Sequence, residues 1–439
     1  METVTLGLFS LILITCLIFG LPTLYALFAG LILFSGYALK KRNPPKKILS
    51  MLISGILTAK NILIVFVLIG MMTALWRACG TIPFIICHAT RLLRPEVLLL
   101  VSFLLNSALS VLTGTSFGTA ATIGVICMAM GVSAGANPML LGGAILSGAF
   151  FGDRCSPFST SALLVSELTK TSIFDNIKNM VRTAWLPFLL TCILYGVFGF
   201  QLHSQAETTD LTALFGREVV LHPAAILPAI VILILALMRI PVKFAMLASI
   251  AVSLIVGFFI QDLSFSDLPQ LLLSGYHAAD PEVAAFLDGG GILSMVKVAA
   301  IVCISSSYAG IFQNTGLLDG LKNGLSKLGS RITPFGAILT AAIGTSMIAC
   351  NQTLSIMLTR QLGNDLEPNN SRMALDLENS AVVVAPLIPW SIAGAVPLAT
   401  IGAPMSSLLA AFFLYLVPLC YLFSAANKAG HVRHLNRLF

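Results

Sequence analysis

The chain has 439 residues, of which 57% are hydrophobic and only 10% are charged. So few charges would leave the apolar surface of a water-soluble domain uncovered, so the composition excludes that class and predicts a membrane protein. The formal net charge of +7 could indicate a nucleic-acid partner. We expect none, because the basic residues gather in short loops and in the C-terminal tail.

Long apolar segments predict an all-α polytopic membrane protein, since they are continuously apolar instead of alternating as barrel strands do. The expected spans, in chain order, are 4–20, 22–39, 61–79, 138–166, 184–202, 223–238, 244–260, 291–310, 372–402 and 405–424. Two more apolar stretches, 97–131 and 333–360, are interrupted by small polar residues and are expected to form re-entrant hairpins.

The charges of the loops predict the orientation. The basic loops at 40–47, 170–182 and 322–331 and the basic tail fall on one side of the ten crossings, and the acidic loops at 207–210 and 262–288 fall on the other. The positive-inside rule therefore places both termini in the cytoplasm. Arg77, Arg91 and Arg94 are exceptions, because they land outside.

A short internal echo indicates two repeats. GTS begins at Gly114 and again at Gly344, which is 344 − 114 = 230 residues later, and each copy precedes an interrupted stretch with one acid. Five crossings and a hairpin in each half would invert the second half, as in secondary transporters. We expect a first repeat at 1–202, an extracytoplasmic linker at 203–222, and a second repeat at 223–439 that ends in the basic cytoplasmic tail.

The span expected at 138–166 contains GDRCSPFS, where Gly152 and Pro157 should break the helix. A broken helix inside a membrane exposes carbonyl oxygens, and the oxygens here are suited to a hard cation or a proton. The expected cation- or proton-binding residues of this half are Asp153, Ser156, Ser159 and Thr160, with Asp153 as the Na⁺ ligand. An alternative is that Asp153 and Arg154 form a neutralising pair near a helix end.

The hairpin tips carry most of the other polar residues. Glycines in TGTSFGT permit a sharp reversal, which would direct N–H groups and hydroxyls towards a ligand. Small residues also let membrane helices pack closely, which is an alternative role. The residues assigned to the tips are Thr113, Thr115, Ser116 and Thr119 in the first half, and Thr345, Ser346, Asn351, Gln352 and Thr353 in the second.

Glu378 is the acid of the second interrupted stretch, and Asn379 and Ser380 follow it as supporting residues. Ionisable groups inside a membrane segment are usually functional. The alternative is that Glu378 and the nearby Asp376 lie in a solvated first turn. No metal or nucleophile motif is present, so we expect no cofactor apart from Na⁺ and/or H⁺ as coupling ions.

Five segments together resemble the hallmark segments of NhaC-type Na⁺/H⁺ antiporters, and they occur in the family's order. They are ALWRACGTIP, LTGTSFGTAATIGV, SGAFFGDRCSPFS, CNQTLSIML and LENSAVVVAPLIPW. The resemblance covers most of the chain between Lys60 and Phe423. It implies the ion-transporter superfamily fold, in which inverted repeats, two opposed hairpins and two broken helices surround a central site.

Two departures from the family pattern concern charge. Exchangers usually have Asp-Thr-Thr after SPxS, where this chain has Thr160 and Ser161, and they usually have Leu-Glu-Asp-Ser where this chain has Asn379. Fewer carboxylates are then available for Na⁺, which makes an organic substrate more plausible.

The sequence therefore predicts a secondary active transporter in the bacterial cytoplasmic (inner) membrane, and not an enzyme. The first expectation is Na⁺/H⁺ antiport by alternating access, in which the two cations compete for Asp153. The alternative is Na⁺- or H⁺-coupled transport of a small organic acid or amino acid. A passive channel and an intramembrane aspartyl protease are weaker alternatives. The expected partners are the lipid bilayer and a small ion or molecule, and a homodimer stays open.

Overall fold

The computed structural model describes residues 2–18, 23–92, 95–201, 211–238, 240–315, 333–349, 351–364 and 366–435. These residues form helices and connecting turns and contain no β-strand apart from one isolated bridge between Tyr276 and Gly289. The all-α prediction is confirmed.

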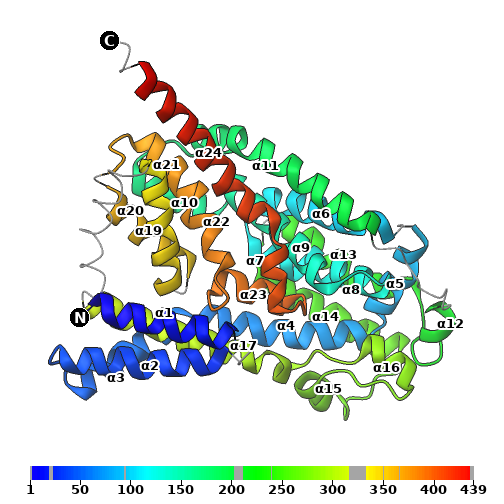
Figure 1. The fold of residues 1–439 in the computed structure, drawn as a ribbon. Helices are drawn as coiled ribbons and strands as arrows, with labels where there is room; N and C mark the ends of the chain where they lie inside the picture. The colour runs from blue at the N-terminus through cyan, green and yellow to red at the C-terminus, as the bar shows by residue number, and fades with distance from the viewer. Residues whose placement is uncertain are drawn as a thin grey trace.

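The N-terminal helices pack on α17 at one end of the molecule (Figure 1). They are α1 (Glu2–Ile18), α2 (Thr23–Lys40) and α3 (Pro45–Thr58), and α17 spans Val296–Thr315. Rings of Phe9, Phe34 and Tyr308 meet edge to face in their core. The sequence did not predict α3, which begins at Pro45, directly after its N-cap Pro44.

The next helices lead into the centre of the fold. They are α4 (Lys60–Ala78), α5 (Thr81–Leu92), α6 (Leu98–Thr113), α7 (Ser116–Thr119), η2 (Ala120–Gly124), α8 (Val125–Ser133), α9 (Pro138–Cys155), α10 (Thr160–Thr169) and α11 (Ile173–Gln201). Helices α6 and α9 lie against each other, and a Cβ atom added at Gly152 would be 2.3 Å from Ser110. Glycine thus allows the two backbones to approach closely, as is common between membrane helices.

A set of shorter helices and loops connects α11 to α17. It comprises α12 (Leu211–Phe215), η3 (Pro223–Ile226), α13 (Leu227–Leu237), α14 (Val242–Ile260), α15 (Leu268–Ser274), α16 (Pro281–Leu287) and η4 (Ile292–Met295). Arg217 forms ion pairs with Asp280 at 2.9 Å and with Glu282 at 3.0 Å and so joins the α12 end to α16. The guanidinium holds the pKa of Asp280 below its ordinary value.

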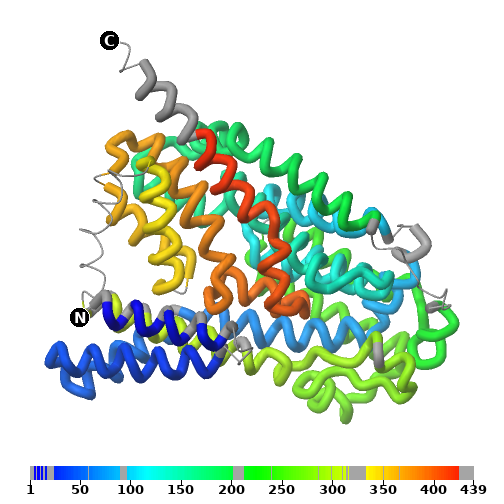
Figure 2. The backbone as a smooth tube through the Cα atoms, viewed as in Figure 1, coloured from blue at the N-terminus to red at the C-terminus, as the bar shows by residue number. Residues whose placement is uncertain are grey.

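The C-terminal part contains a hairpin and a second interrupted helix. Its elements are α19 (Pro334–Ala349), α20 (Gln352–Gly363), α21 (Asn370–Asn379), α22 (Ala381–Val384), η5 (Ala385–Leu387), α23 (Ile392–Thr400), η6 (Met405–Ala410) and α24 (Phe412–Leu435). The axes of 370–387 and 392–400 differ by 55°. Figure 2 shows this change of direction in the orange part of the backbone.

Several helices are long and apolar enough to cross a membrane, so the chain is a multi-pass membrane protein. In the described part they are Lys60–Ala78, Ser116–Ser133, Ile173–Phe200, Val242–Ile260 and Ile292–Phe312, and the bent pair adds a sixth candidate. The span Ser116–Ser133 overlaps the stretch 97–131 that was predicted as a re-entrant hairpin and ends two residues beyond it, so the second arm of that hairpin is itself long enough to cross.

The ten crossings, the inverted relation of the halves and the cytoplasmic termini stay predictions. The same holds for the repeat boundaries. Of the linker predicted at 203–222, residues 203–210 lie outside the described residues, as do the loop residues 322–331 and the last four residues of the basic tail.

Candidate functional site

The first interruption lies between α9 and α10, at Ser156–Ser159, where the sequence predicts a break. Helix α9 ends at Cys155, and Ser159 caps α10 by accepting a hydrogen bond from the N–H of Ala162. The hydroxyl of Ser156 donates to the carbonyl of Val111 at 2.7 Å, so the break is attached to α6. Protein side chains and backbone thus surround the irregular segment, as its place in a membrane protein requires.

Asp153 is buried beside this break, with 3% of its surface exposed. The hydroxyl of Ser159 donates to its Oδ1 at 3.0 Å, and that of Ser161 donates to its Oδ2 at 3.2 Å. The two hydroxyls also lie 2.8 Å apart. The carboxylate therefore sits in a compact group of oxygen atoms, which is the ligand type that hard cations prefer.

Gln352 brings the second half of the chain to the same carboxylate. It is the first residue of α20, and its Nε2 donates to Oδ2 of Asp153 at 3.3 Å and to the carbonyl of Val382 at 3.0 Å. One amide thus links the second hairpin to both interrupted helices. Asp153 lies where three segments from distant parts of the sequence meet.

Arg154 does not form the neutralising pair with Asp153 that the sequence offered as an alternative. No ion pair within 4.0 Å joins the two among the described residues, and Arg154 is fully buried on the other side of α9. Its guanidinium donates to the carbonyls of Glu378 and Met180, each at 3.2 Å, and to the hydroxyl of Thr183 at 2.9 Å.

The same guanidinium also donates to Oδ1 of Asn379. Arg154 therefore fastens the end of α9 to α11 and to the end of α21. Each of these acceptors is a neutral oxygen, so its charge is compensated by dipoles and not by a bonded carboxylate.

Glu378 lies near the end of α21 and is fully buried, but neither of its carboxylate oxygens has a hydrogen-bond partner in the described structure. Asp376 is also buried, at 4% exposure, so the alternative of a solvated first turn does not describe either acid. The helix is distorted directly after Asn379, at Ser380, where φ is −123° and ψ is −87°. Ser380 is buried, and its hydroxyl donates to the carbonyl of Asp376.

The residues of the first predicted tip lie at the joint between α6 and α7. Gly114 adopts a left-handed φ of 69°, and a Cβ there would be 2.5 Å from the backbone of Phe158, so the joint touches the α9–α10 break. The hydroxyls of Thr113 and Thr119 donate to backbone carbonyls one turn earlier, and Thr115 caps α7. Ser116 is buried in the first turn of α7.

The second predicted tip is displaced along the sequence. Gly344 lies inside α19, which ends at Ala349, and Asn351 caps α20 by accepting a hydrogen bond from the N–H of Leu354. Thr345 and Ser346 instead join the two arms of the hairpin. Thr345 lies 2.7 Å from the hydroxyl of Thr359, and Ser346 lies 2.7 Å from that of Ser355.

Of the predicted site residues, Ser159 and Gln352 bond the carboxylate of Asp153. Thr160 and Thr353 are exposed instead. Ser161, one residue after Thr160, takes that place, and sequence reasoning did not include it. The hydroxyl at 161 was visible in the sequence, but which of two adjacent residues faces Asp153 depends on where α10 begins.

Sequence comparison is consistent with this geometry. The sequence model of the Na⁺/H⁺ antiporter family matches residues 3–170 and 151–425. The chain belongs to this family. It is 29% identical to the Na⁺/H⁺ antiporter NhaC of Alkalihalophilus pseudofirmus, over 84% of this chain and 82% of that protein.

Other antiporters of this group act on organic substrates. The chain is 25% identical to the malate-2H⁺/Na⁺-lactate antiporter of Bacillus subtilis, over 88% of this chain and 86% of that protein. It is 27% identical to the arginine/ornithine antiporter ArcD of Halobacterium salinarum, over 80% and 75% respectively. The likeness to NhaC-type proteins predicted from the sequence is confirmed, and the chain is a transporter by family.

Proposed function

We propose that this protein exchanges Na⁺ for H⁺ across the bacterial cytoplasmic membrane, and that both cations bind at Asp153. The observation that carries the proposal is the polar group around this buried carboxylate, in which the hydroxyls of Ser159 and Ser161 and the side-chain amide of Gln352 all donate to it. Family membership supports the exchange of these two cations.

The exchange follows from the energetics of a buried carboxylate. A charged group is expensive to carry through the low-dielectric part of a membrane protein, whereas a carboxylate neutralised by Na⁺ or by H⁺ is much less so. Either cation can neutralise Asp153, and binding of one removes the charge that attracts the other. The site then becomes accessible from the other side of the membrane only with one of the two cations bound, which couples their movements in opposite directions.

Glu378 is proposed as the second titrating group. It lies on the other interrupted helix, and Arg154, bonded to its backbone carbonyl, is the buried cation next to it. The charge of Arg154 partly compensates a negative Glu378, which leaves Asp153 as the acid whose charge has no buried cation bonded beside it.

The test is exchange by the purified protein in proteoliposomes, measured as Na⁺-dependent collapse of an imposed pH gradient. Asp153→Asn keeps the shape of the side chain but cannot bind a proton or a cation as a carboxylate, so exchange should fall to the level of empty vesicles. Asp267→Asn, at an exposed loop position, is the matched control and should exchange like the unchanged protein. Normal exchange by Asp153→Asn would overturn the proposal.

The second candidate is Na⁺- or H⁺-coupled transport of a small organic acid or amino acid. It is favoured by Asn379, which gives Arg154 a neutral partner, and by relatives that carry such substrates. Uptake of labelled organic acids and amino acids under an imposed Na⁺ gradient tests it. Uptake that requires Asp153, with no Na⁺/H⁺ exchange in the absence of the organic substrate, would favour this candidate over simple exchange.

A further inference from the structure

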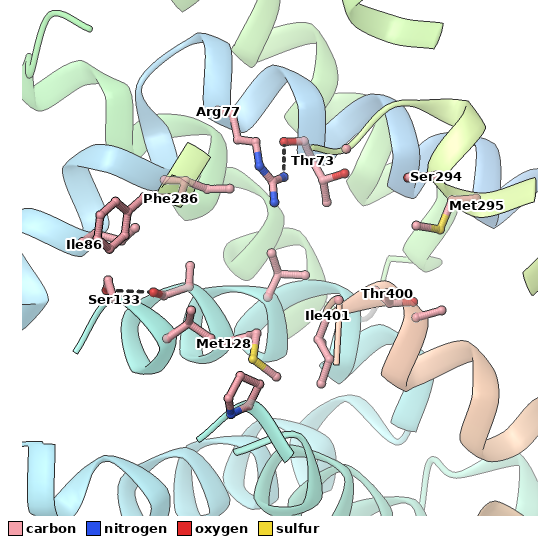
Figure 3. A pocket seen from close by; sticks show the side chains of 18 residues that line it. Thr73, Arg77, Ile86, Met128, Ser133, Phe286, Ser294, Met295, Thr400 and Ile401 are labelled. Atoms are coloured by element: carbon pink, nitrogen blue, oxygen red, sulfur yellow. Dashed lines mark hydrogen bonds between the residues drawn. The ribbon is translucent and has the colours of Figure 1, made fainter. Parts of the chain in front are cut away.

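A cavity with one charged residue in its lining lies apart from the Asp153 group and shares no residue with it. Its volume is about 470 Å³, and it is enclosed by the end of α4, by α5 and α8, by the segment before α17 and by the end of α23 (Figure 3). The size lies in the range of cavities that hold small organic molecules. It would also hold many waters, so its lining decides what fits.

Arg77 is the charged residue of this lining. It belongs to the last turn of α4, and Figure 3 shows its side chain directed from α4 towards α8, across the cavity. Nη1 donates to the carbonyl of Thr73 at 2.8 Å, whereas Nε is buried with no hydrogen-bond partner in the described part of the chain. A guanidinium has five N–H donors in a planar fork, so terminal N–H groups beyond the one bonded to Thr73 remain for a ligand in the cavity.

Asp288 is the acid that acts on Arg77 through space, but it does not pair with it. No ion pair within 4.0 Å joins the two in the described residues. The carboxylate of Asp288 instead accepts the N–H of Ala278 at 2.8 Å and lies 3.3 Å from Nδ1 of His277. Among the residues that the structure describes, no carboxylate lines the cavity, so the positive charge of Arg77 faces it without a bonded counter-charge.

The remaining walls are largely apolar. Ile86 from α5, Met128 from α8, Met295 from η4 and Ile401 after α23 face the same space. One guanidinium against apolar walls suits a ligand with a single negative charge and a short apolar body. A carboxylate matches the fork of the guanidinium with two parallel hydrogen bonds, whereas a hydrated dianion would have to shed water against these walls.

We propose that this cavity is a binding site for a small aliphatic monocarboxylate, with the guanidinium of Arg77 as its anchor. The site is separate from the cation site and does not depend on the proposed exchange. Binding of the ligand requires both the charge of Arg77 and the open volume next to it, which distinguishes this site from a water-filled void.

The probe is radiolabelled hexanoate, added to the purified full-length protein and measured by equilibrium dialysis at fixed ionic strength. Saturable binding at one site per chain is expected, with competition by unlabelled hexanoate but not by hexan-1-ol, which has the same apolar body without the charge. Absence of saturable binding to the unchanged protein would overturn the proposal.

Two substitutions test the two requirements independently. Arg77→Gln removes the charge and should weaken binding at least about tenfold, the loss expected for one charge-assisted hydrogen bond or more. Ala129→Phe fills the cavity from α8 and leaves Arg77 in place, and it should weaken binding to a similar extent. If Arg77→Gln does not fold, Ala129→Phe decides.

Arg217→Gln, which removes an exposed arginine outside the cavity, is the control and should bind hexanoate normally. Normal binding by Ala129→Phe, or by a folded Arg77→Gln, would overturn the site. Asp153→Asn should bind hexanoate like the unchanged protein, so failure of the proposed exchange and failure of this site give different results.

Discussion

Asp153 and Glu378 are both buried acids on interrupted helices, but their surroundings differ. Three side chains donate to the carboxylate of Asp153, whereas neither oxygen of Glu378 has a partner in the described structure. Glu378 lies next to Arg154 instead, whose guanidinium donates to the backbone carbonyl of Glu378 and to the side chain of Asn379.

The difference indicates two ways of keeping a charge inside a membrane protein. Asp153 is surrounded by hydroxyl groups of the first half and an amide of the second half, which can move between the carboxylate and a bound cation. Glu378 instead lies next to the positive charge of Arg154, which comes from the first half. We therefore expect Asp153 to be the group that exchanges cations and Glu378 to adjust the balance of charge around it.

The largest effect should come from removing the fixed positive charge. Arg154→Gln removes the donor to the buried Glu378 carbonyl and to the side-chain oxygens of Thr183 and Asn379. It also leaves Glu378 without its neighbouring cation, so the free energy of unfolding should fall by about 3 kcal/mol. The measurement is thermal unfolding of the purified protein in detergent. Arg217→Gln, in an exposed ion-pair group, should barely change the melting temperature. Equal melting temperatures for the two variants would contradict the role of Arg154.

A smaller effect is expected where the two halves meet at Asp153. Gln352→Leu removes the donor that bonds both Asp153 and the Val382 carbonyl. Loss of one hydrogen bond to a charged group costs about 1.5 kcal/mol, so the Na⁺ concentration for half-maximal exchange should rise about tenfold. The readout is the Na⁺ concentration for half-maximal exchange in proteoliposomes. Gln361→Leu is the matched control, because Gln361 is exposed on the same helix. Similar half-maximal Na⁺ concentrations for the two variants would show that the second hairpin does not contribute to the cation site.

The smallest predicted effect distinguishes two adjacent residues. Ser161→Ala removes one of two hydroxyl donors to Asp153 while Ser159 remains, so half-maximal exchange should need about three to five times more Na⁺, equivalent to about 1 kcal/mol or less. Thr160→Ala should have no effect, since Thr160 is exposed. The reverse result, sensitivity at 160 and none at 161, would show that α10 is rotated relative to this structure.

Local chemistry made part of the fold predictable. The break after α9 follows from Gly152 and Pro157, and the change of direction between η5 and α23 lies in the proline-containing APLIPWS stretch. Helix α3 was missed because Pro44 and Pro45 were assigned to a loop, although a proline in the first turn is compatible with a helix. Gly344 was assigned to a tip because it repeats the GTS of Gly114, but nothing near it ends α19, whereas Asn351 provides an N-cap.

The contents of the site were predictable only in part. Asp153 and Ser159 are close in sequence, so their proximity follows from one broken helix. Gln352 lies 199 residues from Asp153, and its approach depends on how α20 packs between the interrupted helices. The partners of Arg154 on α11 and α21 are likewise set by tertiary packing, which a hydrophobic pattern does not specify.

The central claim is that Na⁺ and H⁺ compete for the carboxylate of Asp153. The most direct test measures the Na⁺ concentration for half-maximal exchange by the unchanged protein at a series of pH values in proteoliposomes. Competition for one group predicts that this concentration rises about tenfold for each unit that pH falls through the acidic range, while the maximal rate at saturating Na⁺ stays constant. A pH-independent half-maximal concentration, with a maximal rate that changes instead, would contradict the account.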